Sequence, residues 1–214
     1  MNRRQLLLSL AAVAAGPRAV FAAPSRFVEG QHYLRVDPPA PTSRDRVDVV
    51  FFFAYTCPHC LQFEPYFEKW LKTAPSDVAV KICPVAWQDQ LLPFTHVYYA
   101  LDTLKLLDKL HQPFFESVIY QEHEYSAQDP LADIADFMKS KGVDMNAWNR
   151  TIRSFGVMNK SRVATQTWQN YRIDSTPMIG VGGLYATGPH LVGSREDTMP
   201  CVDELIELVR RQRG

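Results

Sequence analysis

Residues 47–60 read VDVVFFFAYTCPHC, and they combine a strand pattern, a sharp turn and two closely spaced cysteines. The run from Val47 to Tyr55 consists of β-branched and aromatic residues with a single charge. Such a run is typical of a strand that is buried on both faces. Thr56 is a suitable helix N-cap and Pro58 fits a first helical turn, so the sequence predicts a helix that begins here and continues toward Lys72.

The remaining patterns place this unit in a larger α/β domain. A second strand is predicted over Val78 to Ile82, parallel to the first. Strand patterns return at Met178 to Val181 and at Leu184-Tyr185, joined by Gly182-Gly183, and a last helix follows. Between them, helical spacing of apolar residues covers Leu92 to Lys109, Pro113 to Glu122, Pro130 to Lys141, Asp144 to Phe155 and Val157 to Tyr171. We therefore expect one domain from residues 23–84 and 171–214, with a helical subdomain inserted at residues 85–170.

The first 22 residues have the features of a cleavable export signal. Arg3 and Arg4 precede an apolar run from Leu6 to Ala15, and Val20-Phe21-Ala22 resembles a cleavage site. A membrane anchor is the alternative, but about ten apolar residues fall short of the roughly twenty that span a bilayer. The paired arginines also resemble a twin-arginine signal loosely, so the export route stays open.

Charge and length limit the classes of partner. Removal of residues 1–22 takes away three arginines and no acidic residue, which leaves 192 residues with 20 basic and 23 acidic side chains. A slightly acidic chain has no general attraction to nucleic acid, so we expect no nucleic-acid partner. A chain of this length can bury a sizeable core without disulfide staples, and we expect a monomer.

The Cys57-Pro58-His59-Cys60 motif places two sulfurs at the predicted start of a helix. Backbone N–H groups there have no intrahelical partner, and they stabilise a thiolate. We therefore expect Cys57 to be the acidic, attacking thiol and Cys60 to be the resolving thiol. An imidazole at His59 would favour the anion at Cys57 further, which makes the disulfide a stronger oxidant.

Two structural roles compete with this chemistry. A zinc site normally takes four clustered ligands, yet Cys83 and Cys201 are isolated and no H-x3-5-H pair occurs, so we expect no metal. A purely structural C-x-x-C disulfide is disfavoured, because a helix N-terminus is where a reactive sulfur is favoured. If the last helix packs on the same sheet face as the Cys57 helix, Cys83 and Cys201 could form a disulfide, and two separate buried thiols are the equal alternative.

These motifs resemble those of the DsbA family of periplasmic disulfide oxidases. The resemblance lies in Phe52-Phe53 before the C-x-x-C motif, Gln62-Phe63-Glu64 after it, the helical insertion, and Thr176-Pro177 ahead of a strand. It implies a thioredoxin-like fold with an inserted helical subdomain. It also implies a cis Pro177 that faces the active-site disulfide and a Thr176 that contacts the substrate backbone. The alternative for Pro177 is a proline that merely begins a strand.

One position departs from the family pattern. The family often has a buried acidic residue six positions ahead of the first cysteine, where this chain has Phe51. Proton handling at Cys60 must then use another group or water, and approximate alignment suggests Glu64 and Lys81. Either residue is also explained as a solvated charge.

The resemblance implies an enzyme of the periplasm that donates its Cys57–Cys60 disulfide to unfolded or newly exported thiol proteins through a mixed disulfide. It implies no cofactor besides that disulfide, and a DsbB-like membrane quinone reductase as the reoxidant. A periplasmic reductase or isomerase is the alternative enzyme. A non-catalytic peptide- or metal-binding module with a thioredoxin fold is the alternative outside catalysis.

Overall fold

A five-stranded mixed sheet lies at the centre of the fold, in the order β1-β5-β4-β2-β3. The computed structural model describes residues 25–121, 125–126 and 129–213, so the predicted export signal lies outside the described residues. β2 and β3 run parallel, as predicted, and the other neighbours are antiparallel. The strands are β1 (Tyr33–Arg35), β2 (Val47–Phe53), β3 (Val78–Pro84), β4 (Met178–Val181) and β5 (Tyr185–Thr187).

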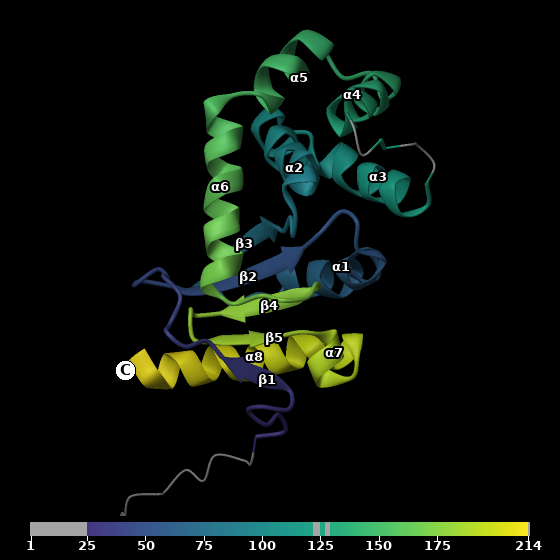
Figure 1. Cartoon of the computed structure of the whole chain (residues 1–214). Coiled ribbons are helices and arrows are strands. Elements are labelled where there is room, and N and C mark those ends of the chain that lie inside the picture. The colour runs from purple at the N-terminus through teal and green to yellow at the C-terminus, as the bar shows by residue number, and fades with distance from the viewer. Residues whose placement is uncertain (1–24, 122–124, 127–128, 214) are drawn as a thin grey trace, which may run out of the picture.

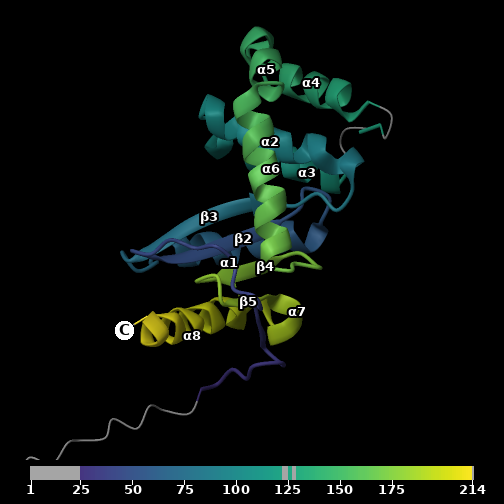
Figure 2. The same cartoon turned by 60° about the vertical axis from the view of Figure 1, so that its left-hand side comes forward.

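Helices cover the sheet and form a further layer beyond the edge strand β3 (Figure 1). α1 packs beside α8 on one face of the sheet, while α6 contacts β3. Figure 2 shows α6 running from α5 down to the sheet. The helices are α1 (Pro58–Leu71), the 3-10 helix η1 (Asp89–Leu91), α2 (Leu92–Leu104), α3 (Leu107–Ile119), α4 (Pro130–Ser140), α5 (Met145–Ile152), α6 (Phe155–Asn170), α7 (Pro189–Val192) and α8 (Arg195–Arg213).

β2 is buried along its whole length, as the apolar run predicted. Phe51 and Phe53 join the core beneath α1 and α8, whereas Val50 and Phe52 join a second core on the opposite face. Both faces of a strand need apolar side chains when helices cover both. The strand is therefore held firmly, and it ends four residues before Cys57.

The helical segment after β3 differs from the predicted elements at one place. Leu92 to Lys109 was predicted as one helix, but α2 ends at Leu104 because Lys105 takes a left-handed conformation with φ 59°. α3 then begins at Leu107 and continues through Pro113, which was predicted to start a helix. A lysine carries no local signal for a left-handed cap, where glycine is usual, so the sequence pattern missed this break.

The disulfide considered for Cys83 and Cys201 is not formed. The predicted packing of the last helix beside α1 is confirmed, and Cys201 lies in the core on that side. Cys83 lies in the core of the opposite face, with its Sγ 3.4 Å from the Ala164 carbonyl oxygen. Both thiols are free. Alternation along β3 turns Cys83 away from α8, so the two sulfurs lie on opposite faces of the sheet.

Gly180 in β4 allows close packing of Tyr171. A Cβ at Gly180 would overlap ring carbons of Tyr171, and the Tyr171 hydroxyl is held by the N–H of Gly183 at 2.9 Å. We expect Gly180→Ala to lower the free energy of unfolding by about 2 kcal/mol, the usual cost of overpacking a core. Urea unfolding measures the change.

The matched control is Gly156→Ala in α6. A Cβ there meets only the Ser154 Oγ at 3.8 Å, and alanine favours the helix over glycine. The control should therefore be neutral or slightly stabilising. Equal losses of stability in both variants would contradict this account of the packing.

Candidate active site

Cys57 is the N-cap residue of α1, one position later than the Thr56 that the sequence suggested. It has extended backbone angles (φ −107°, ψ 106°), and Pro58 is the first helical residue. The Cys57 carbonyl oxygen accepts from the Cys60 N–H at 3.1 Å. An N-cap side chain faces the unpaired N–H groups of the first turn, so the Cys57 sulfur lies where a negative charge is stabilised.

The two sulfurs of the motif have different surroundings. Cys57 is half-buried, whereas Cys60 is 0% exposed. The hydrogen bond from the Cys60 thiol, with smaller contributions from Thr176 and from the backbone N–H groups of Cys60 and His59, lowers the pKa of Cys57 to about 6 against the opposing effect of burial. Burial and the neighbouring Cys57 raise the pKa of Cys60 far above its ordinary value. Only Cys57 is therefore suited to be a thiolate near neutral pH.

His59 is exposed, and the contact by which it lowers the pKa of Cys57 is its backbone N–H. Its side chain lines a hollow of about 510 Å³ that also contains Thr176 and Pro177. The structure therefore brings His59 to the site. The thiolate contact belongs to its backbone, while its imidazole faces the space in front of the motif.

Thr176 and Pro177 meet Cys57 from the far end of the chain. The Thr176-Pro177 bond is cis, as predicted. The Cys57 thiol donates to the Thr176 carbonyl oxygen at 3.2 Å, across 119 positions of sequence. This contact confirms that the Thr176-Pro177 pair lies beside Cys57. The second half of the site therefore comes from the turn before β4.

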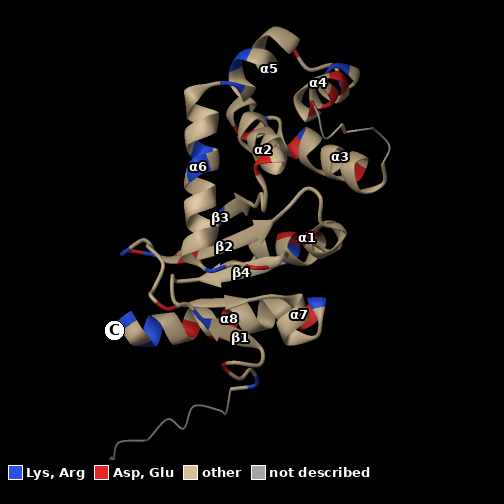
Figure 3. Cartoon of the chain, in the orientation of Figure 1, with Lys and Arg blue, Asp and Glu red and all other residues tan. Residues whose placement is uncertain are grey.

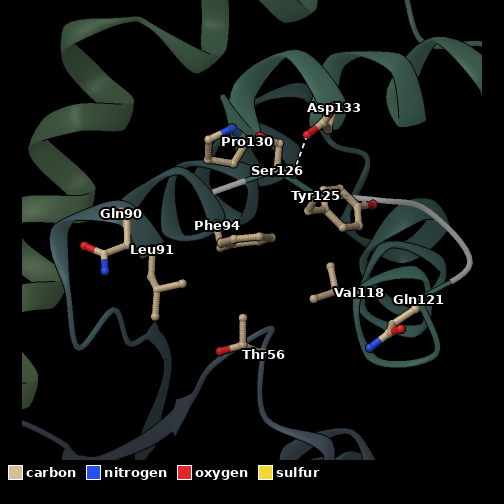
Figure 4. A pocket seen from close by; sticks show the side chains of 10 residues that line it. All are labelled: Thr56, Gln90, Leu91, Phe94, Val118, Gln121, Tyr125, Ser126, Pro130 and Asp133. Atoms are coloured by element: carbon tan, nitrogen blue, oxygen red, sulfur yellow. Dashed lines mark hydrogen bonds between the residues drawn. The ribbon is translucent and has the colours of Figure 1, made fainter. Parts of the chain in front are cut away.

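A second pocket adjoins the motif at Thr56, on the helical segment. It measures about 590 Å³. Figure 4 shows the Phe94 ring between Leu91 and Val118, with Gln90 and Gln121 at opposite ends. An apolar centre with amide groups at its ends is suited to a peptide side chain and its neighbouring backbone.

Glu64 belongs to a buried chain of hydrogen bonds behind the motif. Its Oε1 lies 2.7 Å from His111 Nε2, and His111 Nδ1 lies 2.6 Å from the Tyr55 hydroxyl. Burial raises the pKa of Tyr55 well above its usual value. The phenol therefore stays protonated and donates to Nδ1, which leaves Nε2–H to donate to the Glu64 carboxylate.

This chain of polar groups begins one helical turn from Cys60 and reaches the surface. Glu64 follows Cys60 by four residues in α1, so both side chains lie on the same helix face. Glu64 and His111 also line a surface cavity of about 270 Å³. Sequence reasoning missed His111 and Tyr55, because no local pattern connects residues that are 47 and 56 positions from their partners.

Lys81 is not part of the site. Its Nζ donates to Asp48 Oδ2 at 2.7 Å, and Asp48 also accepts from Ser43 N and Thr42 Oγ1. Although burial opposes the effect, the hydrogen bonds from Lys81 and Ser43 hold the pKa of Asp48 below its usual value. In register, Lys81 pairs with Val50, on the face opposite to Cys60. Asp48 therefore ties the segment before β2 to the sheet, and Lys81 from β3 supports that carboxylate rather than Cys60.

Two further features bear on the class of site. Among the described residues, no group of three or more His, Cys, Asp or Glu side chains could hold a metal ion. In the same part of the chain, no helix is long and apolar enough to cross a membrane. The chemistry available at the site is that of the two thiols.

Comparisons with known proteins agree with this geometry. The chain is 35% identical over 204 residues to the thiol:disulfide interchange protein DsbA of Bordetella pertussis, with 94% of this chain and 96% of the relative covered. It is 33% identical over 210 residues to the protein of the same name from Burkholderia cepacia, with 97% and 96% covered. No protein-family model matches the chain.

Solved structures give the same picture. The crystal structure of Pseudomonas aeruginosa DsbA superposes with a TM-score of 0.79 at 26% identity, and covers 87% of this chain and 96% of its own. The oxidoreductase DsbA from Xylella fastidiosa superposes with a TM-score of 0.73 at 26% identity, with 87% and 97% covered. The predicted thioredoxin-like fold with a helical insertion is confirmed.

The low pKa of Cys57 predicts how stability depends on pH in the dithiol form. Between about pH 6 and pH 9 the folded Cys57 has lost its proton while the unfolded thiol keeps it. The free energy of unfolding should therefore rise with pH across this window, by at most about 1.4 kcal/mol per pH unit, and the gain should be lost as the pH falls to 6. Cys60 is protonated in both states over most of this window; only toward pH 9 does its unfolded thiol begin to ionise, which offsets part of the rise there.

Urea unfolding of the dithiol and disulfide forms at several pH values measures this slope. The disulfide form should lack this rise, since neither Cys57 nor Cys60 then has a proton to lose, while the buried thiols of Cys83 and Cys201 are the same in both forms. The variant His59→Leu keeps the backbone N–H and loses the imidazole. The pH at which its free energy of unfolding begins to rise should therefore be higher only to the extent that the imidazole itself stabilises the Cys57 thiolate. The same pH dependence in both redox forms would refute the acidic assignment of Cys57.

Proposed function

This chain belongs to the DsbA family of thiol:disulfide interchange proteins and is a protein disulfide oxidoreductase; we propose that it donates its Cys57–Cys60 disulfide to the thiols of newly exported, unfolded proteins. The observation that carries this proposal is the contrast between the two sulfurs. Cys57 is reachable and acidic, while Cys60 is buried and its pKa is raised. A disulfide whose reachable sulfur is the better leaving group is readily transferred to another protein.

The reaction proceeds by two exchanges. A substrate thiolate attacks Cys57 Sγ, a substrate–Cys57 disulfide forms, the Cys57–Cys60 bond breaks, and Cys60 leaves as a thiolate that takes up a proton. A second substrate thiolate then attacks the substrate sulfur of the mixed disulfide and releases Cys57 as a thiolate. Two electrons pass from the substrate to the enzyme, so the substrate gains one disulfide and the enzyme becomes the dithiol.

The substrate backbone is proposed to cross the site between the two hollows that flank Cys57. Thr176 and Pro177 line one of them, and Thr56 lines the other. The backbone of Thr176 is proposed to pair with an extended peptide, because it lies just before β4 and borders the hollow beside Cys57. The His59 imidazole would then lie against the substrate beside the reacting sulfur.

The partner that reoxidises the enzyme is proposed to be a DsbB-like quinone reductase of the membrane, which would return the dithiol to the disulfide by the reverse exchange at Cys57. This proposal is supported by the family membership of the chain. The periplasm is the compartment in which such a cycle operates, and a disulfide persists in an oxidising compartment. We propose that the chain acts there as a monomer.

Substitution of each cysteine tests the assigned order of attack. In Cys60→Ser the resolving thiol is absent, so reaction of the dithiol-form variant with a peptide disulfide should accumulate one stable adduct at Cys57. In Cys57→Ser the three remaining thiols, Cys60, Cys83 and Cys201, are all buried, and no adduct should form in the same time. Intact-mass spectrometry counts the adducts. Equal rates of adduct formation in the two variants would overturn the assignment.

Glu64 is proposed to move the proton that Cys60 gains and loses. Phe51 stands where the family often has an acidic residue, and its ring packs against Phe67 at 4.7 Å between centroids. The acidic group is therefore supplied from α1, one turn beyond Cys60. His111 holds the carboxylate. Glu64 also lines a surface cavity that connects it to solvent, and the proton would cross the one helical turn that separates Glu64 from the buried Cys60.

The variant Glu64→Gln keeps the acceptor for His111 but cannot take up a proton at neutral pH. We expect the attack of Cys60 on a Cys57–glutathione mixed disulfide to slow on the order of tenfold or more, as for loss of a general base. The loss should shrink as the pH rises, because hydroxide replaces the carboxylate. Rapid-quench alkylation across pH measures the rate.

Glu68→Gln is the matched control, because Glu68 lines the same cavity but is exposed and lies one turn further from Cys60. It should leave the rate and its pH profile unchanged. A wild-type pH profile in Glu64→Gln would remove Glu64 from the mechanism.

A further inference from the structure

A groove of about 550 Å³ runs along α6, apart from the residues of the active site. Its other wall is the segment from residue 86 to residue 96, which includes η1 and the start of α2. We call it the α6 groove, and it is lined by Ala86, Trp87, Gln88, Asp89, Leu92, His96, Phe155, Met158, Asn159, Ser161, Arg162, Thr165, Trp168 and Gln169.

The α6 groove presents large apolar side chains to solvent. Phe155 is 85% exposed, Met158 is 54% exposed, and Trp87 is 38% exposed with its ring against Trp168. Single exposed apolar residues are ordinary, but a group of them around one groove marks an interaction site. Methionine and aromatic side chains are typical of surfaces that bind varied apolar partners.

The polar lining of the α6 groove suits a polypeptide backbone. It includes the amide side chains of Gln88, Asn159 and Gln169 and the hydroxyl of Thr165. Part of their capacity is used within the chain, because Gln88 Oε1 accepts from Gln90, Asn159 Oδ1 accepts from Arg162, and Thr165 Oγ1 donates to the Ser161 carbonyl oxygen. An amide carries two N–H donors and two acceptor lone pairs, and a hydroxyl carries two lone pairs, so further donors and acceptors remain for a ligand. A backbone presents one donor and one acceptor per residue, so a peptide chain can pair with them in several registers.

The helices beside the α6 groove carry charge of one sign. α5 contains Arg150 and is followed directly by its C-cap residue Arg153, and α6 contains Lys160 and Arg162; neither helix contains an acidic residue (Figure 3). All four are exposed, and Lys160 is paired with Asp102 at 2.8 Å. Asp89 is the acidic side chain within the groove lining. This balance favours an apolar segment that is flanked by acidic residues.

The α6 groove is continuous with the active-site face. Gln90 and Leu91 line the pocket beside Thr56, whereas Gln88, Asp89 and Leu92 line the α6 groove. The single turn of η1 is therefore the ridge between the two. A chain that lies in the pocket beside the catalytic motif needs only to cross this ridge to enter the groove.

We propose that the α6 groove is a second binding site for the polypeptide that is being oxidised, and that it takes a segment of aromatic or aliphatic residues with acidic neighbours. The proposal rests on the proposed function, because its occupant is the substrate. Binding in the groove raises the effective concentration of the substrate thiol at Cys57. It favours unfolded chains, since folded proteins bury such segments.

Binding is tested with a cysteine-free peptide whose central Leu and Phe residues are flanked by aspartates. Two of the four tryptophans, Trp87 and Trp168, line the groove, while Trp70 and Trp148 are buried. Tryptophan fluorescence of the full chain should therefore change on titration with the peptide. No saturable change would overturn the proposal.

The double variant Phe155→Ser/Met158→Ser removes the exposed apolar wall and should weaken the peptide on the order of tenfold. Val28→Ser/Leu71→Ser is the control, because these side chains are 52% and 44% exposed and lie outside the groove. Equal affinity in the two double variants would overturn the site. Thermal unfolding verifies that both are folded.

The charge on α5 has a separate test. Arg150→Gln/Arg153→Gln should weaken the aspartate-flanked peptide but not a serine-flanked one. Lys69→Gln/Lys72→Gln removes the same charge at the end of α1 and is the control. Equal losses with these two variants would show that net charge alone is responsible, and would contradict the proposed acidic preference.

Oxidation kinetics separate the groove from the chemistry. The substrates are dithiol peptides that carry the acidic-apolar segment behind glycine-serine spacers of varied length. For these peptides, kcat/KM should fall on the order of tenfold in Phe155→Ser/Met158→Ser. The rate at which the same variant oxidises dithiothreitol should stay unchanged. Failure of dithiothreitol oxidation in the wild type would defeat the proposed function instead. Binding of the groove to anionic phospholipid vesicles or to a second copy of the chain, with no effect on peptide oxidation, would overturn its assignment to substrate.

Discussion

The two sulfurs of the Cys57-Pro58-His59-Cys60 motif are solvated differently, and the rest of the site depends on this difference. Cys57 lies at the open end of α1, where the Cys60 thiol and two backbone N–H groups stabilise its anion. Cys60 lies one turn inside, where burial makes a thiolate costly. Charge on Cys57 is therefore favoured over charge on Cys60. This imbalance sets both the direction of attack and the tendency of the disulfide to be given away.

β2 and its aromatic side chains keep that imbalance in place. Phe51 and Phe53 pack against the rings of Phe63, Phe67 and Tyr55 beneath the first turns of α1. A carboxylate at position 51 would enter this apolar cluster, where its charge would be destabilised by the loss of solvation. Glu64 lies instead at the rim of the cluster, with His111 as its partner and a cavity beside it. The arrangement keeps an acidic group near Cys60 without a charge in the centre of the core.

Apart from His111, which holds the Glu64 carboxylate, the helical segment contributes surface rather than chemistry. It supplies the pocket beside Thr56 and, across the one-turn ridge of η1, the α6 groove. The strand domain supplies the hollow around Pro177 on the other side of Cys57. An enzyme that must act on many unfolded chains gains from extended, adaptable contacts, because no single substrate shape is available to recognise. In the proposed scheme, the inserted helices set which polypeptides stay long enough to react.

The sequence by itself determined the features that depend on neighbouring residues. The apolar run from Val47 predicted a strand buried on both faces, and the C-x-x-C motif predicted an acidic sulfur at a helix start, since both follow from local backbone geometry. Family resemblance added Thr176-Pro177. Only the tertiary structure decided the contact of Glu64 with His111 and the separation of Cys83 from Cys201. The face of the sheet on which Cys83 lies depends on the register of β3, because a one-residue slip would turn its side chain to the other face. No local pattern encodes which distant side chains then meet.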